Sequence, residues 1–88
     1  MNEASTLLTF PCEFPIKLMG LASVEFEGAV TRIIRKHVPD IGEAAFRLRY
    51  SANGKYLAYT VTILATSQAL LDAIYQECTA NEYILMAL

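Results

Sequence analysis

The stretch FRLRYSANGKYLAYTVTILA, residues 46–65, decides the fold. Residues 46–50 alternate apolar and charged side chains, which is typical of a strand with one buried face. Residues 51–54 end in Asn-Gly, a dipeptide that supplies the positive φ angles of a tight hairpin turn. A second alternating run, rich in β-branched and aromatic residues, follows over 55–65. We therefore predict that the two runs pair as an antiparallel hairpin.

One strand and one helix precede this hairpin. Residues 16–20 alternate and end in glycine, which predicts a strand, and the prolines within 10–15 favour an extended approach to it. Apolar residues at helical spacing predict a helix over about 23–37. Ser23 is suited to cap its first turn, and Pro39 prevents its continuation.

A second helix and a last strand follow the hairpin. Thr66 or Ser67 can cap a helix that runs to about Thr79, and the apolar run 83–88 predicts the last strand. The order β-α-β-β-α-β is that of an α+β, ferredoxin-like fold, a four-stranded antiparallel sheet with two helices on one face. The crossover rule places the first and third strands in the centre and the second and fourth at the edges.

Length and composition predict one domain and exclude several classes of function. The 88 residues suit a single domain over 10–88, preceded by a flexible lead-in over 1–9. Seven basic and nine acidic residues give a net charge of −2, which argues against non-specific binding of nucleic acid. No apolar run approaches the roughly 18 residues of a membrane span. Cys12 and Cys78 form no redox or metal motif, so we expect a reduced, cytoplasmic protein.

Alternation along the strands predicts what each face of the sheet carries. The helices are expected to cover Ile16, Leu18, Phe46, Leu48, Val61, Ile63, Ile84 and Met86. The opposite, open face carries Met19 and a candidate interaction face made of Lys17, Arg47, Arg49, Tyr56, Thr60, Thr62, Leu64, Tyr83 and Leu85. Arg and Tyr are enriched in protein interfaces, and this favours a docking surface. Alternatively, Arg47 and Arg49 keep an edge strand soluble and discourage extension of the sheet. An RNA-binding face is disfavoured, because the central strand lacks the stacking aromatics of such modules.

The remaining histidine, cysteine and glycine positions give little evidence of a catalytic or metal site. Asp40 lies near His37 in sequence, but an acid and a histidine at a helix end are common on surfaces, so we expect His37 to interact with the negative end of the first helix rather than to act as a base. Cys78 is predicted to be a buried hydrophobe. We predict no catalytic residue, no metal site and no cofactor. The candidate ligand site is the turn formed by Met19, Gly20, Leu21 and Ser23, because the N-terminus of a helix can receive an anion.

The chain also resembles the YbeD-like family of small, uncharacterised bacterial proteins, from about residue 8 to residue 88. The residues that carry the resemblance are Phe10-Pro11, Phe14, Lys17, Met19-Gly20, Ser51, Gly54-Lys55-Tyr56, Thr60-Val61-Thr62-Ile63, Ala65-Thr66, Tyr75, Met86 and Leu88. The resemblance implies a ferredoxin-like domain, similar to the small-ligand regulatory domains called ACT domains, without an established enzymatic activity. Genes of this family often lie beside genes for lipoate attachment, which suggests a role near that pathway.

This sequence departs from its relatives in two places. Leu64 and Leu85 occupy positions that are often polar or charged in the family. The first strand-to-helix turn, residues 19–22, lacks the Pro-Gly that follows the first strand in many ACT domains that bind amino acids. The two leucines point to a different partner or self-association surface. The different turn puts amino-acid binding in doubt.

The predicted function is therefore that of a non-enzymatic regulatory or adaptor domain. We expect it to dock a protein partner, or a second copy of itself as a homodimer, through the open face. The alternative is an ACT-like sensor of a small metabolite, linked to lipoate metabolism, with its ligand in the turn of residues 19–23. Neither hypothesis requires nucleic acid or a membrane.

Overall fold

The order of elements is the predicted βαββαβ. The computed structural model describes residues 8–88, so residues 1–7 of the predicted lead-in lie outside the described residues. The elements are β1 (Cys12–Leu21), α2 (Val24–His37), the short 3-10 helix η1 (Glu43–Ala45), β2 (Phe46–Tyr50), β3 (Tyr56–Ala65), α3 (Gln68–Thr79) and β4 (Met86–Ala87). Within the described part of the chain, no helix is long and apolar enough to cross a membrane.

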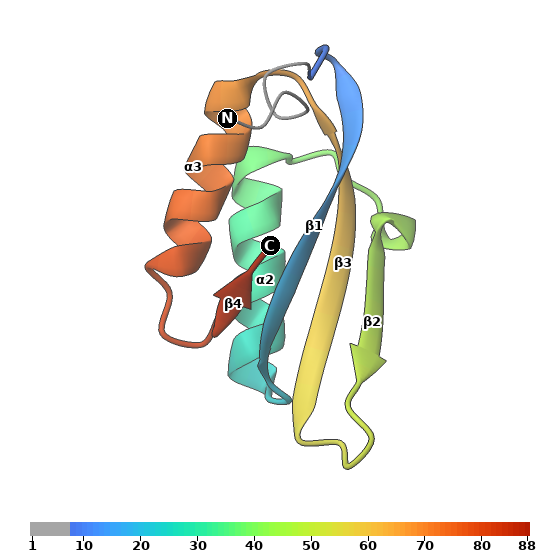
Figure 1. Cartoon of the computed structure of the whole chain (residues 1–88), viewed down its shortest axis with the longest axis vertical. Helices are drawn as coiled ribbons and strands as arrows, with labels where there is room; N and C mark the ends of the chain where they lie inside the picture. Colours follow the sequence, from blue (N-terminus) through green and yellow to red (C-terminus); the bar gives the residue numbers. More distant parts are fainter. Residues whose placement is uncertain (1–7) are drawn as a thin grey trace.

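The four strands form one antiparallel sheet in the order β2-β3-β1-β4. Both helices pack on the same face of this sheet, and the other face is open (Figure 1). The structure thus confirms the ferredoxin-like fold, with the first and third strands in the centre. The long pairing of β1 with β3, Cys12–Leu21 against Tyr56–Ala65, forms the middle of the sheet.

Serine caps begin both helices where the sequence predicts them. The Ser23 hydroxyl accepts a hydrogen bond from the backbone N–H of Phe26 at 3.0 Å, and the Ser67 hydroxyl accepts one from Leu70 at 3.1 Å. Each bond satisfies a backbone donor that the helix itself leaves without a partner. In α2 the acidic residues lie in the first turn and the basic residues in the last, as the helix dipole favours.

The core lies between the helices and the two central strands. Its largest fully buried side chains are Phe26, Ile16, Leu18, Ile33, Ile34, Leu57, Ile63, Ile74, Val30, Val61 and Cys78. Tyr59 of β3 lies among them, with its ring centroid 5.8 Å from that of Phe26. Burial of apolar surface at these positions supplies the main driving force for folding.

The first strand is longer than predicted, because Pro15 lies inside it rather than before it. The backbone N–H and C=O of Lys17 bond to Leu88 on the β4 side of β1. Pro15 is two residues away, so its nitrogen faces the same side, beyond the last pair that β4 makes with β1. The missing N–H therefore breaks no bond of the sheet.

The hairpin turn between β2 and β3 is also different from the prediction. Only Gly54 has a positive φ, +75°, whereas Asn53 does not. Asn53 acts through its side chain instead, with Oδ1 accepting from the backbone N–H of Lys55 at 3.1 Å and from the Ser51 hydroxyl at 2.9 Å. The loop closes where the N–H of Ser51 bonds to the carbonyl of Tyr56.

The last strand is shorter than predicted, and the prediction placed Met86 on the wrong face of the sheet. Ile84 is buried as expected, but it precedes β4 in a turn closed by its N–H to the Asn81 carbonyl. Met86 pairs with Met19 and therefore lies on the open face, not under the helices. The turn ahead of β4 interrupts the two-residue alternation that the prediction assumed.

Gly20 permits a close approach of two other segments to the backbone of β1. A Cβ at this position would lie 2.5 Å from the backbone oxygen of Tyr83 and 2.5 Å from the Phe26 ring. We expect Gly20→Ala to lower the free energy of unfolding by about 1–3 kcal/mol, since the backbone has to shift. Gly28→Ala is the matched control, because Gly28 is exposed in α2 with nothing near its absent Cβ. That control should stabilise the protein by about 0.5–1 kcal/mol.

Urea unfolding of the three proteins measures both changes. A Gly20→Ala variant as stable as the unchanged protein would show that the approach of Phe26 and Tyr83 does not constrain this position.

Candidate functional site

The register of the strands assembles most of the predicted interaction face on the open side of the sheet. Arg47, Thr60 and Lys17 lie in one row across β2, β3 and β1. Arg49 begins the next row, which continues through Ala58, Met19 and Met86. We call these two rows, with the residues that extend them along β1 and β3, the open face.

The two ends of the open face are more apolar. At one end Leu64 lies opposite Glu13 of β1 and is 57% exposed, and Thr62 lies opposite Pro15. At the other end Tyr56 lies opposite Leu21, and both are exposed. The open face therefore combines a cationic centre with exposed apolar side chains at its ends.

Charge is distributed unevenly over this acidic chain. The side chains of the open face include three cations, Lys17, Arg47 and Arg49, against one acidic side chain, that of Glu13, whereas the whole chain has a net charge of −2. Within residues 8–88, the ion pair is that of Lys36 with Glu77 on the helices, and His37 hydrogen-bonds to the same carboxylate. None of the three cations of the open face takes part in them.

Two residues of the predicted interaction face lie ahead of β4 rather than in it, although the N–H of Leu85 bonds to the Met19 carbonyl of β1 at 2.8 Å. Tyr83 and Leu85 precede β4, and the Asn81 side chain accepts a hydrogen bond from the backbone of Tyr83. Both side chains are exposed. Their assignment to the open face depended on a strand that began at residue 83, and that strand begins at Met86.

The predicted ligand turn is tightly built. The space beside Gly20 is filled by the Phe26 ring and the Tyr83 carbonyl. The Ser23 hydroxyl already accepts from the N–H of Phe26. Leu21 is exposed and Met19 lies on the open face. Binding of a ligand by this turn stays a prediction, with fewer free polar groups than the sequence suggests.

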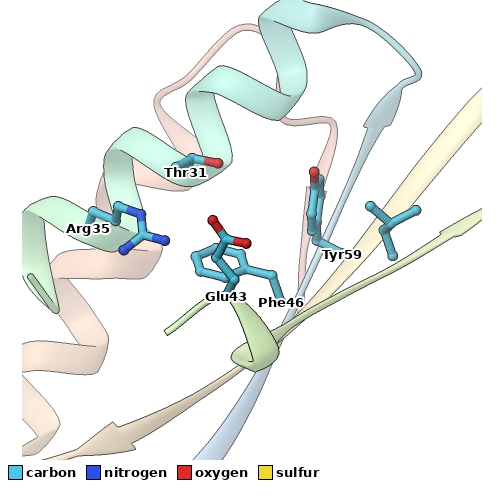
Figure 2. Close-up of a pocket in the computed structure, with 6 residues that line it drawn as sticks. Thr31, Arg35, Glu43, Phe46 and Tyr59 are labelled. Carbon is cyan, nitrogen blue, oxygen red and sulfur yellow. The ribbon is translucent and has the colours of Figure 1, made fainter. Parts of the chain in front are cut away.

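A groove that the sequence did not predict lies between α2 and the edge strand β2, on the helix side of the sheet. Its cavity measures about 250 Å³ and is lined by Thr31, Arg35, Glu43, Phe46, Leu48 and Tyr59. Figure 2 shows Thr31 and Arg35 extending from α2 toward Glu43, Phe46 and Tyr59. We call it the α2–β2 groove. It exists because β2 lies beyond the helices, so Leu48, predicted to be covered, is 51% exposed.

Two side chains of the groove are held in place. Arg35 donates from Nη1 to the Ile41 carbonyl at 2.8 Å, and its guanidinium carbon lies 5.5 Å from the centroid of the Phe46 ring.

Burial raises the pKa of Tyr59, and the nearby Glu27 and Tyr50 raise it further. The Tyr59 hydroxyl is therefore neutral at the floor of the groove. A periodic pattern alone could not reveal the groove, since it does not show how far the helices extend over the sheet.

His37 joins the two helices rather than forming a reactive site. Its Nε2 lies 2.8 Å from Oε1 of Glu77, and Nζ of Lys36 lies 3.2 Å from the same oxygen. The hydrogen bond from His37, and then that from Lys36, holds the pKa of Glu77 below its usual value. Sequence reasoning placed His37 correctly at the end of its helix but missed this partner 40 residues away.

The thiols differ in their surroundings. Cys78 is buried, and burial followed by the nearby Glu77 carboxylate raises its pKa to about 11. A thiol that is protonated and buried is a poor nucleophile, so its predicted role as a core residue fits the structure. Cys12 is half-buried in β1. Among residues 8–88, no cluster of three or more His, Cys, Asp or Glu side chains could hold a metal ion.

Comparison with known proteins places this fold in a family. The family model described as "Protein of unknown function (DUF493)" matches residues 5–88. The chain belongs to the DUF493 family. Relatives include a UPF0250 protein of Chromobacterium violaceum, 41% identical over 99% of this chain and 98% of the relative. A UPF0250 protein of Nitrosomonas europaea is 40% identical over 100% of both chains.

Membership in DUF493 confirms the resemblance to YbeD-like proteins. The solution structure of HP0495 from H. pylori has the same fold as this DUF493 domain, with a TM-score of 0.72 and 13% sequence identity. The match covers 92% of this chain and 85% of HP0495. Neither the family description nor the names of these relatives states an enzymatic activity.

The two thiols of this DUF493 protein should react at different rates. At about pH 8 we expect a disulfide reagent such as Ellman's to modify Cys12 readily and Cys78 only after unfolding, because the raised pKa of Cys78 keeps its thiol protonated. Cys12→Ser should remove the fast phase. Equal rates for both thiols in the folded protein would contradict the burial of Cys78.

The ion pairs of Glu77 should make stability depend on pH. Because the pKa of this carboxyl is lowered in the folded state, its contribution is present above the ordinary glutamate pKa and is lost as pH falls through the folded value. Glu77→Gln should therefore reduce stability in urea at about pH 7 and leave it unchanged at about pH 3. Glu82→Gln, an exposed carboxylate in the loop after α3, serves as control. A deficit that is equal at both pH values would contradict this origin.

Proposed function

We propose that this DUF493 domain is a non-enzymatic adaptor that docks an acidic surface of a protein partner through its open face. The observation that carries this proposal is the row of Arg47, Thr60 and Lys17, with Arg49 in the next row, on a chain of net charge −2. The cations lie on the side of the sheet that no element of residues 8–88 covers (Figure 1).

Exposed apolar side chains on this surface support a docking role. Leu64, Tyr56, Leu21 and Met86 are all exposed on the open face around the cations. Arginine, tyrosine and methionine are enriched at the centres of interfaces, and methionine adapts its shape to a partner. The composition supports a docking surface with a basic centre and apolar contacts near its ends.

The charges favour an acidic partner over a second copy of this chain. Arg47 and Lys17 flank β3, about 10 Å apart as two strand spacings imply. Two open faces pressed together would place these cations against the same cations of the other copy, at a cost in free energy. A surface that carries carboxylates is attracted by these cations instead of repelled. The positive electrostatic field of the open face also increases its rate of association.

Charge reversal tests this proposal. Three baits are compared in a lysate of the source organism. They are the unchanged chain, the double variant Lys17→Glu with Arg47→Glu, and the control Arg32→Glu, whose site on α2 is exposed. We expect an acidic protein to bind the unchanged chain and the Arg32→Glu control, to dissociate with added salt, and to be lost from the double variant.

Circular dichroism and thermal unfolding verify that each bait is folded. If all three baits retain the same proteins, the open face does not select the partner and the proposal is wrong.

A further inference from the structure

The edge of β2 presents unpaired backbone groups to the outside of the sheet. The N–H of Ser51 bonds to the Tyr56 carbonyl at 2.9 Å, which fixes the alternation along the β2–β3 pair. Arg47 and Arg49 then bond to β3, while the N–H and C=O groups of Leu48 and Tyr50 point away from it. We call this outward row the β2 edge.

The other side of the sheet offers no comparable edge. β4 has only two residues, and beyond it β1 carries Pro15, which has no N–H to donate. Proline at such a position protects an edge from pairing with another chain. The β2 edge has no proline and a regular five-residue strand, so it is the part of residues 8–88 best suited to accept an additional strand.

The side chains beside the β2 edge favour particular residues in an added strand. On the helix side Leu48 and Tyr50 are 51% and 52% exposed, and Leu48 lines the α2–β2 groove. On the open side Arg47 and Arg49 extend from alternate positions. A strand paired with β2 would place every second side chain near the arginines and the others near Leu48 and Tyr50.

A second copy of this chain is a poor occupant of the edge. When two β2 edges pair antiparallel over most of their length, the Arg47 and Arg49 side chains of both copies meet on the open side of the enlarged sheet. Like charges directly opposite each other destabilise a strand pair. The same arginines favour an added strand that carries carboxylates at these positions.

We propose that the β2 edge binds an extended peptide segment in which acidic residues alternate with apolar ones. The segment adds a fifth strand, with its acidic side chains beside Arg47 and Arg49 and its apolar side chains over Leu48 and Tyr50, toward the α2–β2 groove (Figure 2). This inference goes beyond the proposed docking of a folded partner, because it depends on backbone groups of the edge rather than on the open face.

Synthetic peptides test the proposal directly. The probe is an eight-residue peptide that alternates Glu with Val, blocked at both ends, and the comparison peptide has Lys in place of Glu. Titration followed by amide hydrogen exchange should show binding of the Glu peptide alone, with new protection of the Leu48 and Tyr50 amides. Protection of these two amides is the signature of strand addition, since neither bonds to β3.

Two matched pairs of variants test the proposal further. The first pair separates the backbone contribution from the side-chain contribution, and the second tests the charge preference. Leu48→Pro removes an outward N–H without breaking a bond to β3, whereas Leu48→Ala shortens the side chain and keeps that N–H. We expect Leu48→Pro to weaken peptide binding about tenfold more than Leu48→Ala. Reversal of both arginines, Arg47→Glu with Arg49→Glu, should transfer the preference to the Lys peptide, whereas Lys17→Glu should not.

Several results would overturn the proposal. They are equal binding of the Glu and Lys peptides, no binding of either, or equal effects of Leu48→Pro and Leu48→Ala. Protection of Leu48 and Tyr50 that needs no peptide and rises with protein concentration would assign the edge to a second copy instead. The proposal expects Lys17→Glu to leave peptide binding unaffected even where it removes an acidic partner from the bait, because the open face and the β2 edge are separate sites.

Discussion

The pairing of β1 with β3 is the constraint on which the rest of the molecule depends. Ten residues of each strand pair in a single register, and this register fixes which side chains face the helices. A shift of β1 by one residue against β3 would turn the side chains of β1 over, exposing Leu18 and burying Lys17. The buried face and the cationic open face are therefore two consequences of one alternation. Gly20 fixes the same arrangement at its end, where it leaves room for Phe26.

The helices cover the central strands and leave the second strand at the margin. β2 has no fully buried residue, in contrast to β1 and β3. Its apolar residues therefore border a groove instead of completing the core, and its outward backbone groups have no partner among the described residues. The arginines of β2 add a charge that repels a second copy of the same strand. These features are the basis of the proposal that β2 prefers an acidic segment.

Local patterns were sufficient to predict the order of elements, the two serine caps and the central position of the first and third strands. They failed where the outcome depends on contacts between distant segments. Alternation could not show that a turn at Ile84 would place Met86 beside Met19, or that the helices would leave Leu48 uncovered. For the same reason the open face was predicted in most of its residues, whereas the α2–β2 groove was missed. The pairing of His37 with Glu77 likewise depends on how the helices pack.

The central claim is that the cations of the sheet direct this domain toward acidic partners and away from itself. Sedimentation equilibrium of the free protein tests it most directly, at about 0.15 M salt, where charges within about 8 Å still interact. The account predicts a monomer over the accessible range of protein concentration. A stable dimer whose interface, mapped by amide hydrogen exchange, contains β2 or the open face would contradict it.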